Sequence, residues 1–120
     1  MVGCVVRHSS EPIWWSLFAA GGVVAALVAP VQIALTGIAA ALGWADDAFT
    51  HARVLALVSH PISRLYLFVL ISLPLFHSAH RFRFTLIDLG LKQGRGLVAV
   101  LCYGAAVAGT ILAALVLIRL

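Results

Sequence analysis

The chain has 120 residues, of which 63% are hydrophobic and 10% are charged, and its formal net charge is +4. Soluble domains carry about 25% charged residues, so this composition excludes an ordinary water-soluble domain and indicates a chain that lies in a lipid bilayer. One membrane-spanning helix needs about 20 apolar residues, so the length allows three spans with short connectors and no separate soluble domain.

Basic residues and cysteines narrow the function classes further. The eight Lys and Arg residues lie between apolar runs, where they orient the spans and contact anionic headgroups, so nucleic-acid binding is not expected. Cys4 and Cys102 lie far apart and fit no CxxC or metal-ligand spacing, so neither a disulfide framework nor a metal site is predicted.

The first span is predicted over about residues 13–42, with Ser10 as its N-cap and Pro12 in the first turn. Its apolar run is too long for a signal peptide, so we interpret it as a retained helix. About 30 residues exceed the bilayer core, so tilt or a kink is expected, with Pro30 as the kink. Gly43 is predicted to end this helix.

The second span is predicted over about residues 62–86, beginning after Pro61 and extending out of the bilayer at its end. Before it, residues 53–59 are predicted to form a short helix at the membrane interface. Gly90 and Gly94 are expected to break the helix in the following connector.

The third span is predicted over about residues 97–118 and carries no charge until Arg119. Ala105, Gly109 and Ala113 recur every four residues, which predicts a face of small side chains that a neighbouring helix approaches closely. Chance also produces such repeats, because Ala and Gly are common in membrane helices.

These elements predict an all-α membrane protein with three transmembrane helices in a single domain, residues 1–120. The positive-inside rule sets its direction. Five basic residues fall on one side, namely Arg7, Arg81, Arg83, Lys92 and Arg95. Three fall on the other, namely Arg53, Arg64 and Arg119. The N-terminus and the second connector are therefore predicted to be cytoplasmic and the C-terminus periplasmic.

The segment LPLFHSAHRFRF, residues 73–84, places polar side chains at the inner end of the second span. Residues three, four or seven positions apart share one helix face, and here they are His77, His80, Arg81 and Phe84. Arg83 is expected to point elsewhere. These residues either mark the membrane edge or, through Arg81 and a neighbouring His, donate hydrogen bonds to an oxygen ligand such as a quinone carbonyl or a lipid phosphate.

Haem binding is not expected in this chain. A bis-histidine haem needs two imidazoles that face each other, whereas His77 and His80 lie on the same helix and the other histidines lie outside the spans. Trp14 and Trp15 lie at the inner end of the first span. They fit either an aromatic belt at the interface or indole donors that complete a ligand site with Arg81.

The order of these features resembles the D subunit of bacterial quinol:fumarate reductase. The resemblance rests on EPIWWSLFAAGG (11–22), LVAPV (27–31), RVLAL (53–57), LPLFHSAHRFRF (73–84) and the Asp-Leu pair at 88–89. It implies a membrane anchor of the bacterial cell membrane that pairs with a second anchor, the C subunit. Together these anchors would hold a flavoprotein subunit and an iron–sulphur subunit at the cytoplasmic face.

The resemblance also implies a reaction and a site. Menaquinol would be oxidised near the cytoplasmic face, and electrons would pass through iron–sulphur clusters to FAD, where fumarate is reduced in anaerobic respiration. Trp15 and Arg81 match residues that form the quinol pocket, with His80 beside them. Trp14, His77 and Phe84 are expected around it. Such a chain is not catalytic alone, and anchors of this type usually lack haem.

Two features of the family, a second quinone position and a proton acceptor, are not assigned to residues of this chain. A proposed second quinone position would match Leu57, Ser59 and His60, but His60 precedes a proline here, so we do not carry that site over. A proton acceptor is also needed, and Glu11 lies at the helix start. The base is therefore expected from the C subunit.

Three alternatives stay open on sequence alone. The first is an anchor of a succinate dehydrogenase, the same architecture run in the opposite direction. The second is a small membrane transporter, which the absence of a charge in the middle of any predicted span disfavours. The third is a purely structural anchor that touches no ligand.

Overall fold

The computed structural model describes residues 9–44 and 47–120, and these residues form helices and connectors without a strand. Three helical stretches are long and apolar enough to cross a membrane, namely Glu11–Ala39, Pro61–Asp88 and Arg95–Arg119. The predicted all-α, three-span fold is therefore confirmed. Arg7 and Cys4, used in the topology and cysteine predictions, lie outside the described residues.

The first span is one continuous run of four helical segments: α1 (Glu11–Val23), η1 (Val24–Val28), α2 (Ala29–Ile33) and η2 (Ala34–Ala39). Pro30 has no backbone N–H to donate to the preceding turn. The turn before it widens, and Ala29 N–H donates to the Val24 carbonyl, five residues back. The disturbance expected at Pro30 thus takes the form of π-helical turns on both sides of a short α-helix.

The ends of this span follow local sequence signals in part. Ser10 occupies the N-cap position as predicted, but its side chain makes no capping hydrogen bond. At the other end Gly43 has a positive φ of 68°. The N–H groups of Gly43 and Trp44 donate to the carbonyls of Ala40 and Ala39. This pattern of two bonds closes a helix end, so Gly43 ends the helix as predicted.

The second span begins with a short helix and a histidine cap. Helix α3 (His51–Ser59) precedes α4 (Pro61–Asp88), and His60 is the N-cap of α4. Its Nδ1 accepts a hydrogen bond from Ile62 N–H at 3.3 Å. Gly90, with φ of 115°, ends α4 in the same way that Gly43 ends the first span.

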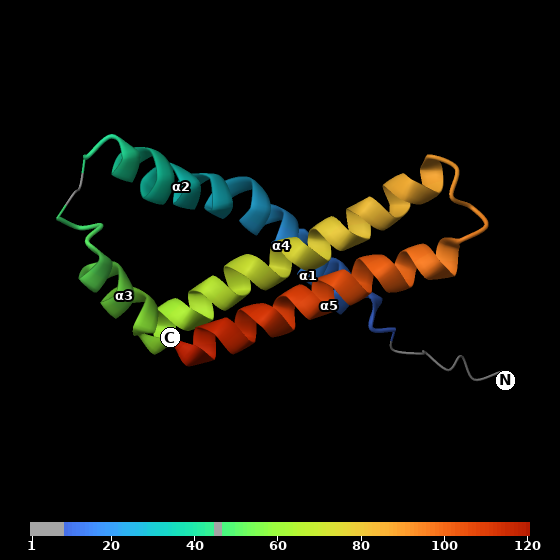
Figure 1. Ribbon diagram of the computed structural model, residues 1–120. Coiled ribbons are helices and arrows are strands. Elements are labelled where there is room, and N and C mark those ends of the chain that lie inside the picture. Colours follow the sequence, from blue (N-terminus) through green and yellow to red (C-terminus); the bar gives the residue numbers. More distant parts are fainter. Residues whose placement is uncertain (1–8, 45–46) are drawn as a thin grey trace, which may run out of the picture.

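Helix α5 (Arg95–Arg119) lies alongside α4, whereas the first span crosses α4 at an angle (Figure 1). Ala106 of α5 is only 2% exposed, and a Cβ added at Gly109 would lie 3.0 Å from Leu75 Cδ1. Ala105, however, is exposed. A spacing of four residues drifts by about 40° per step around an α-helix, so Ala105 is turned from the contact with α4, and the approach of a neighbouring helix at this residue stays a prediction.

The closest approach of the first span to α4 is made at two glycines. A Cβ added at Gly21 would lie 2.6 Å from the Leu73 carbonyl oxygen and 2.9 Å from His77 Cβ. A Cβ added at Gly22 would lie 2.8 Å from His77 Cε1. The buried contact surfaces consist mainly of small residues, and most large apolar side chains face outward, as expected for helices packed in lipid.

Candidate functional site

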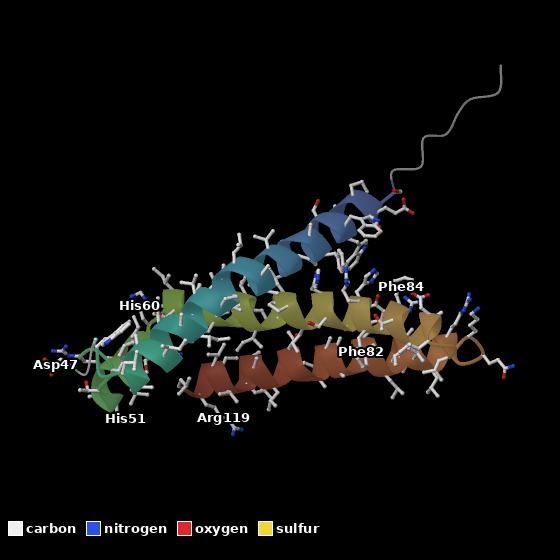
Figure 2. All side chains as sticks on the ribbon, turned by 90° about the horizontal axis from the view of Figure 1, so that it is seen from above. Asp47, His51, His60, Phe82, Phe84 and Arg119 are labelled. Atoms are coloured by element: carbon white, nitrogen blue, oxygen red, sulfur yellow. The ribbon has the colours of Figure 1, made fainter. Side chains whose placement is uncertain are left out.

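A cavity of about 550 Å³ opens between the start of α1 and the C-terminal half of α4. Its walls are Glu11, Trp14, Trp15, Leu17, Phe18, Phe76, His77, His80 and Tyr103. Figure 2 shows side chains of the start of α1 and of α4 projecting into the space between these helices, on the side of α4 where Phe84 lies. The volume falls within the range of small-molecule sites, which are usually lined by apolar and aromatic groups with a few polar ones.

The sequence of α1 explains why the helices separate here. Glu11, Trp14, Phe18 and Gly21 follow one another at spacings of three and four residues, so they share one helix face. The glycine end of this face touches α4, while the ring-bearing end cannot approach as closely. The bulky side chains therefore hold the start of α1 away from α4, and a wedge-shaped space results.

His77 is fixed against the first span from two sides. Its ring stacks on Phe18, with ring centroids 4.3 Å apart and an interplanar angle of 16°. Its Nδ1 lies 2.9 Å from the Phe18 carbonyl oxygen. Because a carbonyl only accepts, Nδ1–H is the donor in this bond. Gly22 leaves the room that the imidazole ring occupies.

His80 lies at the centre of an aromatic cluster that joins three helices. Its Nδ1 lies 2.7 Å from the hydroxyl of Tyr103 on α5. Its ring centroid lies 4.7 Å from that of Phe18 and 4.9 Å from that of Phe84. Trp15 is next, at 6.1 Å. The hydrogen bond and the rings together hold the imidazole at the cavity wall.

The structure brings together most of the side chains that the sequence singled out. Trp14, Trp15, His77 and His80 line the cavity, and Phe84 contacts the His80 ring. Arg81 does not line the cavity within this chain, and it is exposed.

The expectation that Arg83 points elsewhere is wrong. Its guanidinium lies 5.3 Å from the centroid of the Phe84 ring and 5.7 Å from that of Tyr103. An α-helix rotates by about 100° per residue, so Arg83 lies about 60° around the helix from His80, whereas Arg81 lies about 100° from it. Arg83 is therefore nearer than Arg81 to the face that carries His80.

Sequence reasoning missed several lining residues, above all Phe18 and Tyr103. Phe18 had a signal, since it follows Trp14 by four residues and so shares its face. Tyr103 had a weaker signal as a hydroxyl-bearing aromatic residue inside an apolar span. Only the packing of α5 on α4 shows which helix its hydroxyl meets.

Polar groups at the opposite end of the spans form hydrogen bonds that join helices or close helix ends. Tyr66 OH donates to Gln32 Oε1 at 3.0 Å, which joins α4 to α2. Ser59 Oγ donates to the Leu120 carbonyl, and His60 caps α4. The position that would match a second quinone site therefore contains residues engaged in helix-end contacts.

No group of three or more His, Cys, Asp or Glu side chains in the described parts of the chain has the arrangement of a metal site. His77 and His80 both come from α4, and both are bonded through Nδ1 to groups of this chain. The cavity is thus an aromatic space with two oriented imidazoles on one wall.

Comparisons with known proteins agree on one family. The family model for the fumarate reductase D subunit matches residues 5–118. The fumarate reductase D subunit of Mycobacterium tuberculosis (strain ATCC 25618 / H37Rv) is 54% identical over 106 residues, covering 87% of this chain and 83% of that protein. The corresponding D subunit of Shewanella sp. (strain W3-18-1) is 40% identical over 122 residues, covering 100% of this chain and 99% of that protein.

Proposed function

Because the chain belongs to the family of fumarate reductase D subunits and is a multi-pass membrane anchor of that bacterial complex, we propose that its aromatic cavity forms part of a menaquinol site. The observation that carries this proposal is the cavity itself, in which indole, phenyl and imidazole rings from three helices surround one space. Flat rings fit the quinol head group, and the two imidazoles supply polar contacts to its oxygens.

The resemblance also supports a proposal for the wider assembly. A second three-helix anchor, the C subunit, completes the site and, with this chain, holds the iron–sulphur and flavoprotein subunits at the cytoplasmic face. Those partner subunits would hold the iron–sulphur clusters and FAD, which would supply the path for electrons from menaquinol to fumarate. The basic residues near the cavity end support this orientation, since Arg81, Arg83 and Lys92 all lie at the C-terminal end of α4 or just beyond it.

Within this site each residue has a distinct task. Trp15 donates from its indole N–H. Arg81, which does not line the cavity within this chain, supplies a charge-assisted donor once the second anchor completes the site. The contact of Phe84 with His80 supports the imidazole ring. Since both intramembrane histidines lie on α4 and are bonded within this chain, we propose that it holds no bis-histidine haem on its own.

Replacement of Trp15 by Leu in the assembled complex tests the site. We expect fumarate reduction driven by menadiol, a soluble menaquinol analogue, to fall about tenfold through loss of a ring and a donor. Fumarate reduction driven by reduced methyl viologen, which does not need a quinol site, stays unchanged. The matched control is Trp44→Leu, because Trp44 is 76% exposed and lies at the far end of the first span.

Unchanged menadiol-driven turnover in Trp15→Leu would contradict the proposed site and favour a purely structural anchor. An equal loss in Trp44→Leu would contradict it too, since a general disturbance of the membrane domain would then explain both results.

A further inference from the structure

His77 and His80 are bonded to the chain through the same ring nitrogen but to partners of different chemistry. His77 Nδ1 meets the Phe18 carbonyl oxygen at 2.9 Å, and His80 Nδ1 meets the Tyr103 hydroxyl at 2.7 Å. In each ring the other nitrogen, Nε2, has no hydrogen-bond partner within the described residues. Whether Nε2 of each imidazole donates to a ligand or accepts from it therefore depends on whether Nδ1 of the same ring carries the hydrogen.

The polarity of His77 follows from its partner alone. A backbone carbonyl cannot donate, so the hydrogen of the neutral imidazole is on Nδ1. Nε2 then carries a lone pair and accepts. The hydrogen bond to the Phe18 carbonyl selects this ring orientation, and stacking on Phe18 holds the plane of the ring.

The polarity of His80 follows from the relative strengths of two groups. A phenol is a better donor than acceptor, and an unprotonated imidazole nitrogen is a better acceptor than a phenolic oxygen. The guanidinium of Arg83, 5.7 Å from the centroid of the Tyr103 ring, withdraws electron density from the phenol and strengthens it as a donor. Tyr103 therefore donates to Nδ1, and the hydrogen of His80 is on Nε2.

We propose that Tyr103 is a positioning residue that fixes His80 as a donor toward the cavity, so that the His80–His77 pair presents a donor beside an acceptor. This proposal rests on the proposed quinol site, and it predicts that the site prefers the quinol to the quinone. A quinol hydroxyl both donates and accepts, so one hydroxyl satisfies both imidazoles. A quinone carbonyl only accepts and leaves His77 Nε2 without a partner.

The spacing along α4 suits this pairing. Residues three positions apart are neighbours on a helix surface, with Cβ atoms about 5–6 Å apart. Both rings line the same cavity. The Phe18 ring lies against both imidazoles, with centroids 4.3 Å from His77 and 4.7 Å from His80, so the pairing requires the quinol hydroxyl to bind at the cavity wall that these rings share.

The variant that tests the proposal is Tyr103→Phe in the assembled complex. It keeps the ring that packs beside Arg83 and removes only the hydroxyl. Its matched control is Tyr66→Phe, which removes the other interhelical tyrosine hydrogen bond, to Gln32, away from the cavity.

The first measurement is solid-state nitrogen NMR of the chain carrying isotope-labelled histidine, assembled with unlabelled partner subunits. We expect one tautomer at His80, with hydrogen on Nε2, in the native chain and in Tyr66→Phe. A mixture of tautomers is expected in Tyr103→Phe. A hydrogen on Nδ1 of His80 in the native chain, or an unchanged tautomer in Tyr103→Phe, would overturn the proposal.

The second measurement is steady-state kinetics. We expect Tyr103→Phe to raise the KM for menadiol about twofold, because a mixture of tautomers leaves only part of the His80 population with hydrogen on Nε2, with viologen-driven turnover unchanged. An unchanged KM, or the same rise in Tyr66→Phe, would overturn the functional part of the proposal. If the native complex oxidised no menadiol, the proposed quinol site would fail, while the nitrogen signals would still decide the tautomer.

Discussion

The two ends of this membrane domain use similar polar residues for different purposes. At the cavity end, side chains from α1, α4 and α5 converge on one space, and His77 and His80 line it with only Nδ1 bonded within the described residues. At the other end, His60 accepts from an N–H in the first turn of α4, and Gln32 bonds to Tyr66. A polar residue in an apolar chain therefore indicates function only when its hydrogen-bonding capacity is left over after folding.

The largest effect is expected at Gly21, where α1 approaches α4 closely beside the cavity. Gly21→Val introduces atoms where a Cβ alone would lie 2.6 Å from the Leu73 carbonyl oxygen, a backbone atom that cannot turn away. We expect the amount of assembled complex in membranes to fall about tenfold, because overpacking forces α1 away from α4. Viologen-driven fumarate reduction of isolated membranes measures it.

The control for this prediction is Gly37→Val in the same span. A Cβ at Gly37 meets only Ile33 Cγ2, at 4.0 Å, and the β-branched side chain carries the same helix propensity cost. Equal accumulation of the two variants would mean that α1 and α4 do not meet at Gly21 in the membrane.

A second prediction compares a histidine from each end. His77→Phe keeps the stacking on Phe18 but removes the Nδ1–H bond and the acceptor at Nε2. We expect menadiol-driven turnover to fall about tenfold, and the preference for menadiol over menadione as a ligand to disappear, because the acceptor for the quinol hydroxyl is lost. Inhibition of turnover by menadione, compared with the KM for menadiol, measures this preference.

His60→Phe is the matching change at the other end, where it removes the cap of α4. We expect a small loss of thermal stability and unchanged menadiol kinetics, since His60 does not line the cavity. If His60→Phe reduced turnover as much as His77→Phe, the two ends would not differ in function.

The smallest effect is expected at Gln32. Gln32→Leu removes its bond to Tyr66 between α2 and α4. Interhelical hydrogen bonds in membranes contribute about 0.6 kcal/mol on average, because the separated helices find other partners. We expect thermal unfolding of the complex to shift by a few degrees at most, with turnover unchanged. A loss of quinol-driven turnover would show that ligand contacts extend to this end.

The candidate site is predictable from sequence only where its residues share a helix. Trp14 and Trp15, and likewise His77 and His80, stand close together in the chain, so helical spacing identifies them. Tyr103 cannot be found in this way, because its position beside His80 depends on how α5 packs against α4. For Arg83 the prediction fails because the shared face was counted from His77, from which Arg83 is rotated by about 120° around the helix, although it lies three residues from His80.

The sequence by itself determined three apolar helices, the two glycines that close helix ends at positions 43 and 90, and the proline that begins α4. These features depend on local forces, namely transfer of apolar groups into lipid and the backbone freedom of glycine. Tertiary structure alone decided where α1 meets α4, which groups meet Nδ1 of His77 and His80, and that a cavity lies between α1 and α4. Those properties depend on contacts between residues distant in the chain, and no local pattern encodes which side chain fills the facing space.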